Sequence, residues 1–586
     1  MVARRKTGRV VGVNGDLVTV EMNRPVMQNE TAHIVSGEHR LKSEVIRIQG
    51  PIAEVQVYED TLGVRVGDEV IFTGELLSAE LGPGLIGQVF DGLQNPLPRV
   101  AERFGFFIPR GISFDALDRN RKWRFVPSAK VGDVVSGGHF LGYVREGIIT
   151  HRIMVPFQAT EEYEIRSISD EGDYGLEDTI ARVETPRGDI LELGMMFHWP
   201  IKVPIQVYSE RLRPDDTLIT GIRIIDTLFP IAKGGTYCIP GPFGAGKTVL
   251  QHITARHAEV DLVVIAACGE RAGEIVEILR EFPQIEDPRT GRSLMERTII
   301  ICNTSSMPVA ARESSVYMAI TIAEYYRQMG LDVLLLADST SRWAQAMREI
   351  SGRLEEIPGE EAYPAYLESR IASFYERAGA VVLYNGERGS VTIGGTVSPA
   401  GGTFEEPVTQ GTLKVVGAFH GLSRNRANAR RFPSIDPHES WSNYSGIASP
   451  DMLRVAREIL SKGREVEQMM KVVGEEGTSL NDYQYYLKAE LLDHVYLQQN
   501  AFDRIDGVTG RERQAYVFGL LVDILQRRFG FADKDQALKF FQSLRQMFID
   551  WNYCEWESPE FREMEEKLRS FLNEAREDEK GLHSHS

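Results

Sequence analysis

The segment Gly241 to Gln251, GPFGAGKTVLQ, carries residues whose types and spacing suit the binding of a nucleoside triphosphate. It fits the pattern G-x-x-x-x-G-K-[ST], with Gly241, Gly246, Lys247 and Thr248 at the fixed positions. Glycines let the backbone curl so that N–H groups and a helix N-terminus face a phosphate. Lys247 would reach the β- and γ-phosphates, and the Thr248 hydroxyl would coordinate Mg²⁺. A glycine-rich turn without a ligand is the alternative, which the predicted strand before the loop and helix after it disfavour.

Two acidic residues end predicted apolar strands and suit the same chemistry. Asp338 closes VLLLAD, where a carboxylate can hold Mg²⁺ through a water beside Thr248. Glu270, in ACGERAGE, follows another apolar strand and is a candidate to orient and polarise the attacking water. Either acid alone could equally be an exposed loop residue. Their combination with the loop favours phosphoryl transfer to water.

The composition describes what must surround this loop. A chain of 586 residues is long enough for about four domains, and 42% apolar with 26% charged residues is typical of a soluble globular protein. No apolar run approaches the length of about 18 residues that spans a bilayer, and the N-terminus lacks a signal-peptide core. We therefore expect a cytoplasmic chain. The net charge of −18 argues against nucleic acid as a partner.

The four cysteines, Cys238, Cys268, Cys302 and Cys554, are widely spaced along the chain. The first three lie in apolar, strand-like runs. This spacing favours buried, reduced thiols over a disulfide framework or a zinc site.

Periodicity along the chain predicts a multidomain fold. Residues 1–75 alternate like the strands of a small N-terminal β-barrel, with a hairpin turn at Asn14-Gly15. Strands alternating with amphipathic helices in the centre predict an α/β P-loop (RecA-like) domain with a parallel sheet covered on both faces. The predicted parts are the barrel at 1–75, a helix-and-turn connection at 76–117, an inserted β-rich bulge domain at 118–200, the P-loop nucleotide-binding domain at 205–445, and a C-terminal helical bundle at 446–586 with a frayed tail.

Several long motifs resemble the catalytic A subunit of the V/A-type rotary ATPases, of the bacterial or archaeal type. They are GPFGAGKT, GER at 269–271, LMERT at 294–298, NTSSMPVAARE at 303–313, the run from 337 to 370, EPVTQGTLKVVGAF at 406–419 and YLQQNAFD at 496–503. The resemblance extends over essentially the whole chain. The stretch at 118–200 resembles the bulge domain of that family, which F-type β subunits lack.

The resemblance implies roles for particular residues. Glu270 would activate water, Arg271 would be its partner near the γ-phosphate, and Phe432 and Phe502 would enclose adenine. The catalytic residues are then Glu270, Arg271 and Lys247, and the metal ligands are Thr248 and, through water, Asp338. The nucleotide-binding residues are Gly241, Pro242, Phe243, Gly244, Ala245, Gly246, Lys247, Thr248, Val249, Phe432, Gln499, Asn500, Ala501 and Phe502.

Some positions depart from the family pattern. GERAGE replaces the usual GERGNE, which puts the surroundings of Glu274 in question, and the segment 433–446 differs from the usual sequence beside the adenine site. Ala245 stands where eukaryotic members carry cysteine, so a disulfide switch at the loop is not expected.

The resemblance also implies partners. ATP, ADP and phosphate would bind at the interface with a B subunit in an A3B3 ring, and the B subunit would supply the transition-state arginine. Central-shaft and peripheral-stalk subunits would join the ring to a membrane sector that moves H⁺ or Na⁺, with this chain on the cytoplasmic face. A Rho-type nucleic-acid motor and a non-catalytic assembly subunit are the alternatives. The direction of the reaction and the transported ion stay open.

Overall fold

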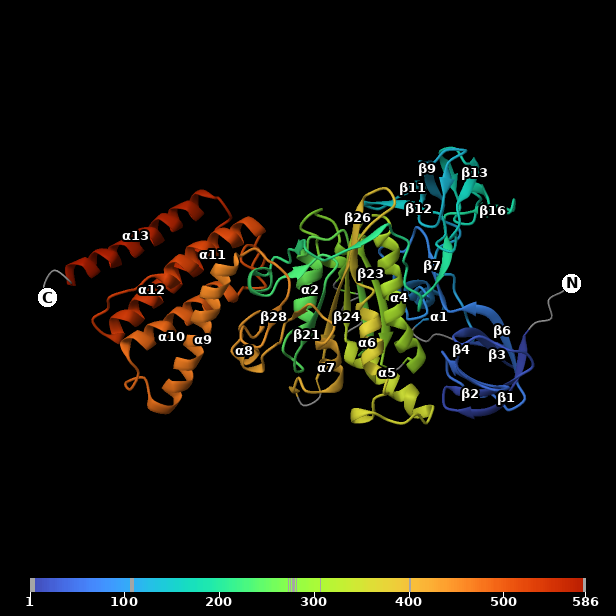
Figure 1. Ribbon diagram of the computed structural model, residues 1–586, viewed down its shortest axis with the longest axis horizontal. Helices are drawn as coiled ribbons and strands as arrows, with labels where there is room; N and C mark the ends of the chain where they lie inside the picture. Colours follow the sequence, from blue (N-terminus) through green and yellow to red (C-terminus); the bar gives the residue numbers. More distant parts are fainter. Residues whose placement is uncertain are drawn as a thin grey trace.

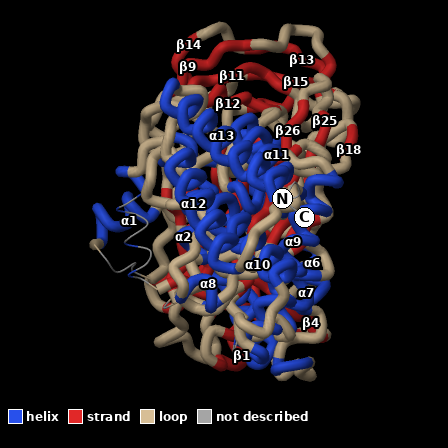
Figure 2. Tube along the Cα trace, turned by 90° about the vertical axis from the view of Figure 1, so that its left-hand side faces the viewer, coloured by secondary structure: helices blue, strands red, loops and turns tan. Residues whose placement is uncertain are grey.

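The computed structural model describes residues 6–105, 110–271, 273, 276, 280, 282–305, 307–399 and 402–582, and the side chains of Glu270 and of residues 574–582 lie outside this description. The chain forms an elongated molecule (Figure 1) with the C-terminal helices at one end, the large sheet in the middle and two β-rich parts at the other end. Seen along the long axis (Figure 2), the C-terminal helices lie in front of the central sheet.

The N-terminal part is a closed barrel of six strands in the order β1-β2-β5-β4-β3-β6. Its strands are β1 (Thr7–Asn14), β2 (Leu17–Met22), β3 (Glu30–Ser36), β4 (His39–Gln49), β5 (Ile52–Val57) and β6 (Glu69–Leu76). Alternate residues such as Val18, Val20 and Ile34 fill the interior and are 0% exposed, as period-2 strands require. The predicted β1–β2 hairpin is present, but Asn14 pairs with Leu17, so Gly15 and Asp16 form its turn.

The segment predicted as a helix-and-turn connection contains strands as well as a helix. It holds β7 (Ser78–Leu81), β8 (Val89–Phe90) and α1 (Leu97–Phe104). β7 pairs with β17 (Phe197–Pro200), and β8 joins the edge of the large sheet beside β23 (Thr298–Thr304). The helical prediction was wrong for these strands because their pairing partners lie more than a hundred residues away in the chain, beyond the reach of a local pattern.

Between β7 and β17 the chain forms two four-stranded sheets, in the orders β10-β13-β15-β16 and β12-β11-β9-β14. Their strands are β9 (Trp123–Pro127), β10 (Val134–Val135), β11 (Phe140–Glu146), β12 (Ile149–Met154), β13 (Tyr163–Ile168), β14 (Gly172–Tyr174), β15 (Ala181–Glu184) and β16 (Ile190–Leu193). The β-rich character predicted for this insertion is confirmed.

The central sheet has the strand order β28-β27-β21-β26-β24-β22-β23-β8, with β25 and β18 attached at β26. Its strands are β18 (Glu210–Leu212), β21 (Thr236–Pro240), β22 (Leu262–Glu270), β23 (Thr298–Thr304), β24 (Asp332–Asp338), β25 (Gly379–Val382), β26 (Arg388–Val397), β27 (Ala418–Phe419) and β28 (Trp441–Ser442). The strands from β21 to β23 run parallel.

Alternate residues of β22 enter two different hydrophobic cores. Val264 and Ala266 pack on the side of α4 (Val309–Arg327) and α5 (Thr340–Arg353), whereas Val263 and Ile265 pack on the side of α2 (Lys247–His257). A parallel sheet covered on both faces explains the continuous apolar runs in the sequence. The predicted α/β architecture is therefore confirmed.

The C-terminal part is helical, as predicted. Its helices are α9 (Pro450–Val473), α10 (Leu480–Leu492), the π-helix η6 (Asp493–Leu497), α11 (Arg511–Gln526), α12 (Lys534–Asn552) and α13 (Pro559–Leu582). The side chains of Ser449 and Ser479 cap α9 and α10, because each accepts a hydrogen bond from a backbone N–H group in the first turn of its helix. The tail predicted to be frayed continues α13 as far as Leu582, and its last four residues lie outside the description.

The buried thiols predicted from the sequence are present, since Cys238, Cys268 and Cys302 are buried and form no disulfide bond within the described part of the chain. Burial raises the pKa of the Cys302 thiol to about 12, which keeps it protonated. In the described part of the chain, no helix has both the length and the apolar character needed to cross a membrane.

Candidate nucleotide-binding site

The glycine-rich loop connects β21 to α2 at the carboxyl end of the central sheet. Gly244 and Gly246 have φ values of 79° and 90°, a backbone conformation that residues other than glycine rarely adopt. A Cβ atom on Gly241 would lie 2.7 Å from Cβ of Leu422. Glycine is thus required for backbone conformation at two positions and for close packing at the third.

Lys247, the first residue of α2, turns its side chain back over the loop. Its ammonium donates hydrogen bonds to the carbonyl oxygens of Gly241 at 2.7 Å and Pro242 at 3.0 Å. Phosphate oxygens are stronger acceptors for an ammonium because their hydrogen bonds are charge-assisted. The loop therefore already holds the lysine where a phosphate in the loop could accept its hydrogen bonds.

Thr248 and Asp338 meet across the loop, although they are 90 positions apart in the sequence. The Thr248 hydroxyl donates to one carboxylate oxygen of Asp338 at 3.0 Å, and the Thr396 hydroxyl donates to the other at 2.6 Å. Asp338 ends β24 and Thr396 lies near the end of the adjacent β26. A hydroxyl beside a carboxylate is an all-oxygen donor set, which fits Mg²⁺. Thr396 was missed by sequence reasoning, although its position on the neighbouring parallel strand places it at the same sheet edge.

Glu270 is the last residue of β22, and its backbone pairs with Thr304 at the end of β23. The Glu270 side chain and Glu274 lie outside the described part of the structure. Arg271 is exposed, and its guanidinium carbon lies 5.5 Å from the centre of the Phe243 ring. The ends of β22, β24 and β26 therefore bring Glu270, Asp338 and Thr396 to one edge of the sheet, beside the loop.

A second part of the site is a pocket of about 410 Å³ between the loop helix and the C-terminal helices. Six predicted nucleotide-binding residues line it: Val249, Phe432, Gln499, Asn500, Ala501 and Phe502. Phe502 is 98% exposed and Phe432 is partly buried, so both rings are accessible to a planar ligand. The other lining residues were missed by sequence reasoning: Arg430, His494, Gln498, Asp506, Ile549, Asn552 and Tyr553.

Gln499 shapes this pocket through bonds to the protein. Its side-chain oxygen accepts from the Arg223 N–H at 2.7 Å, and its side-chain nitrogen donates to the carbonyl oxygens of Gly221 and Asp506. Its backbone N–H donates to the Phe432 carbonyl at 2.7 Å. Gln499 thus fixes the segment that carries Phe502 beside the segment that carries Phe432.

The loop and the pocket are also joined directly. The hydroxyl of Ser434, two residues after Phe432, donates a hydrogen bond to the carbonyl oxygen of Ala245 at 2.6 Å. Within the described residues, the lining of the pocket stops at Phe432 and resumes at His494, so it takes nothing from the unusual segment 433–446. The phosphate loop and the segment that carries Phe432 are therefore held side by side.

This fold and this site define a P-loop nucleotide-binding protein of the rotary-ATPase class. Family models match the chain in four consecutive parts: "ATP synthase alpha/beta family, beta-barrel domain" at 10–74, "ATPsynthase alpha/beta subunit barrel-sandwich domain" at 114–202, "ATP synthase alpha/beta family, nucleotide-binding domain" at 221–442 and "C-terminal domain of V and A type ATP synthase" at 450–529.

Curated relatives narrow the class to one family. The chain is 61% identical over 567 residues to the V-type ATP synthase alpha chain of Treponema denticola, covering 97% of this chain and 96% of that protein. It is also 61% identical to the V-type ATP synthase alpha chain of Borrelia recurrentis, over 96% of this chain and 98% of that one. The chain belongs to the family of V-type ATP synthase alpha chains.

Among solved structures, the chain is similar to the assembled ATPase EscN from the enteropathogenic E. coli type III secretion system. The TM-score is 0.61 at 19% sequence identity, and the match covers 88% of this chain and 100% of that one. At this identity the likeness concerns the fold alone.

Proposed function

We propose that the loop, the strand-end acids and the adjoining pocket form a catalytic ATP site. The contact between Thr248 and Asp338 at 3.0 Å carries this proposal, because it joins the phosphate loop to a carboxylate in the arrangement that phosphoryl transfer requires.

Family membership makes this chain the catalytic subunit of a V/A-type ATPase, an ATP hydrolase or synthase coupled to ion translocation. The alternative function, that of a Rho-type nucleic-acid motor, is not better supported than this one by the relatives of the chain. A non-catalytic assembly subunit would not need Lys247, Thr248 and Glu270 together.

Each residue has a distinct task in the proposed mechanism. Backbone N–H groups of Phe243 to Gly246 and the N-terminus of α2 hold the phosphates, and Lys247 neutralises charge on the β- and γ-phosphates. Thr248 and, through water, Asp338 would hold Mg²⁺, which neutralises charge between the two phosphates when it is bound. Glu270 orients and polarises the attacking water, and Arg271 acts beside the γ-phosphate. Phe432 and Phe502 enclose the adenine ring.

The proposed assembly follows from the resemblance to rotary ATPases. The family places this chain in a multisubunit nucleotide-driven complex. We infer that it alternates with a B subunit in an A3B3 ring, which connects through shaft and stalk subunits to the membrane sector. The chain would then lie on the cytoplasmic face of the membrane, and the predicted domain ranges 1–75, 118–200, 205–445 and 446–586 would be its barrel, bulge, nucleotide and helical domains.

The test is the substitution Lys247→Ala in the reconstituted complex. It removes a positive charge from the phosphates and touches no hydrophobic core, so ATP turnover should be abolished while thermal unfolding of the chain is unchanged. The control is Lys414→Ala, since Lys414 is an exposed lysine of the same domain that pairs with Glu368. A near-normal ATPase rate for Lys247→Ala would refute the proposed site.

A further inference from the structure

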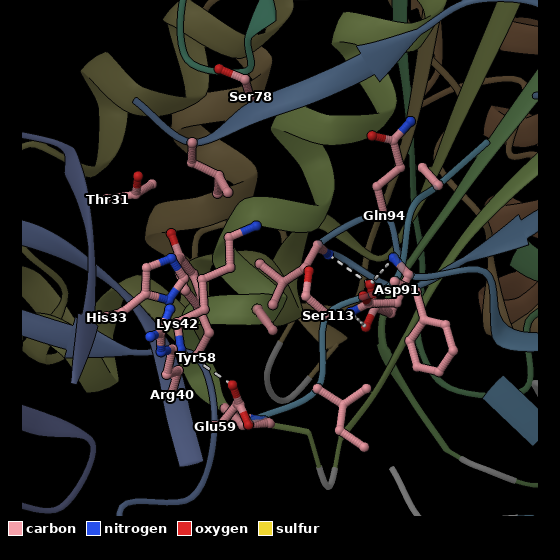
Figure 3. Close-up of a pocket in the computed structure, with 18 of the residues that line it drawn as sticks. Thr31, His33, Arg40, Lys42, Tyr58, Glu59, Ser78, Asp91, Gln94 and Ser113 are labelled. Carbon is pink, nitrogen blue, oxygen red and sulfur yellow. Dashed lines mark hydrogen bonds between the residues drawn. The ribbon is translucent and has the colours of Figure 1, made fainter. Parts of the chain in front are cut away.

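A sizeable cavity lies away from the nucleotide loop, between the barrel and the central sheet (Figure 3). Its volume is about 710 Å³, within the range of about 300–1,000 Å³ typical of small-molecule sites. The barrel supplies one wall through β3 and β4, and the segments around β7 and β8 supply another. Thr304, Met307 and Ala311, at the end of β23 and the start of α4, close the side toward the sheet.

The barrel wall presents basic side chains because of strand alternation. Ala32, Ile34 and Leu41 point into the barrel, so His33, Arg40 and Lys42 point outward toward the cavity. His33 and Lys42 are paired across β3 and β4. Burial and the nearby charges of Lys42 and Arg40 lower the pKa of His33, which keeps its imidazole neutral.

Within the described residues, two buried nitrogen atoms of this cavity have no hydrogen-bond partner, whereas His198 pairs with Glu80 at 3.8 Å. Lys42 is partly buried; burial lowers its pKa, and the nearby charges of Asp91, Glu80 and Glu59 oppose that shift. Arg110 Nε and His33 Nδ1 are the two atoms, both buried, for which the described part of the chain offers no hydrogen-bond partner. A buried donor without an acceptor costs free energy. These groups therefore favour a ligand that brings acceptors into the cavity.

The acids of the cavity wall are already used by the protein. Asp91 accepts from the N–H groups of Leu93 at 2.9 Å and Asn95 at 2.8 Å. Glu59 accepts the backbone N–H groups of Lys42 and Gly111.

Glu80 likewise pairs with Arg119 at 3.0 Å. Asp60 and Glu75 are exposed, and Asp60 accepts the Leu62 N–H at 2.9 Å. The inner acids thus hold loops in place, whereas Arg110 Nε and His33 Nδ1 have no acceptor among the described residues.

We propose that this cavity binds a small organic anion whose carboxylate or phosphate group accepts from Lys42, Arg110 and His33. Leu77, Leu93 and Met307 offer apolar contacts for the rest of the ligand. The site is separate from the ATP site and does not depend on it.

The test measures binding of two probes, inorganic pyrophosphate and citrate, by calorimetry with the full-length chain. The chain carries Lys247→Ala, which weakens phosphate binding at the nucleotide loop, and the cavity variants below separate any binding that the loop retains. We expect saturable binding of pyrophosphate if the anion is a phosphate and of citrate if it is a carboxylate. Lys42→Met should weaken that binding about tenfold or more, because a charge-assisted hydrogen bond is lost.

Two further variants keep the test decisive. Arg110→Gln should weaken binding of the same probe, and this variant replaces Lys42→Met in the test if Lys42→Met fails to fold. Lys130→Met removes an exposed lysine that does not line the cavity and should leave binding unchanged. The proposal is overturned if neither probe binds, if both cavity variants bind normally, or if binding disappears in the assembled ring because a neighbouring subunit fills the cavity.

Discussion

The Lys247 ammonium makes two hydrogen bonds to carbonyl oxygens of its own loop. An entering phosphate must replace these acceptors. The free energy gained on binding is therefore the difference between a hydrogen bond to a charged acceptor and one to a neutral acceptor, rather than that of a whole hydrogen bond. The lysine is held in place before the ligand arrives, which reduces the entropy lost on binding. The same argument applies to Thr248, whose hydroxyl already faces Asp338.

Glu270→Gln tests the proposed role of the acid at the end of β22. The amide has nearly the same shape as the carboxylate but cannot polarise water as a base. We expect Mg·ATP to bind with unchanged affinity while the hydrolysis rate falls by about 10²- to 10⁴-fold. Equilibrium binding and single-turnover hydrolysis measure the two effects separately. A parallel loss of affinity and rate would instead assign Glu270 a structural role.

Phe502→Ala tests the aromatic wall of the pocket. Because the side chain is 98% exposed, its removal should leave the stability of the chain unchanged. ATP should bind about two- to tenfold more weakly, since an aromatic contact contributes about 0.5–1.5 kcal/mol. Inorganic triphosphate, which has no ring, is the matched control ligand and should bind as before. Equal weakening of both ligands would place Phe502 at the phosphates and contradict the adenine assignment.

The element that holds the pocket together is the segment between η6 and α11, and Arg223 anchors it. This arginine is 1% exposed and lies just before the π-helix η1 (Ile224–Leu228). Its guanidinium donates to Asp506 at 2.7 Å and to the carbonyl oxygens of Tyr496 at 2.8 Å and Gln498 at 2.6 Å. A planar fork of donors satisfies these separate acceptors at once, which an ammonium cannot do. The segment that carries Phe502 is therefore attached to the nucleotide part by Arg223 as well as by Gln499.

Arg223→Lys should accordingly damage both stability and nucleotide selectivity. Loss of a partner from a buried ion pair costs about 3–5 kcal/mol, and the lysine should recover only part of this. Urea unfolding measures the stability, and the ratio of ATP to inorganic triphosphate affinity measures the pocket. Arg504→Lys is the control, because Arg504 pairs with Glu555 on the exposed surface. Unchanged stability of Arg223→Lys would show that the buried contacts are replaceable.

These elements differ in how far the sequence could predict them. The loop is predictable because its glycines, Lys247 and Thr248 are contiguous and their conformation is local. Phe432 and Phe502 were found through resemblance, since no spacing rule joins two segments so far apart. Arg223 and Tyr553 were missed because their roles arise only when the C-terminal helices pack on the sheet. The strand β7 was missed for the same reason, as its partner β17 follows only after the inserted sheets.

At the scale of the whole molecule, the pocket joins two parts of the chain. Val249 and Phe432 belong to the nucleotide part, whereas Ile549 and Tyr553 come from the end of α12 and the residue after it. A ligand in the pocket contacts both parts at once, so its binding free energy depends on how the helical end lies against the sheet. For the proposed ATP site, we therefore expect nucleotide binding to be linked to the position of α9 to α13, which form one end of the molecule (Figure 1).

The chain carries a phosphate loop, and Asp338 and Glu270 are the acids proposed to hold the metal and to orient the attacking water. The charge-neutralising arginine is expected from a B subunit across an interface. We therefore expect the purified chain to bind ATP but to hydrolyse it slowly, and addition of the B subunit to raise turnover strongly, since an arginine finger contributes about 10³- to 10⁵-fold. Steady-state hydrolysis is measured with and without the partner, at concentrations where the ring assembles.

Arg271 provides the competing explanation, because it follows Glu270 directly and its exposed guanidinium lies near Phe243 of the loop. If Arg271 supplied the transition-state charge in cis, the isolated chain would already be fully active and Arg271→Ala would abolish that activity. If the partner supplies it, Arg271→Ala in the isolated chain changes an already low rate little, and the stimulation depends on an arginine of the B subunit. Full activity of the isolated chain would thus refute the interface site and favour a homomeric motor.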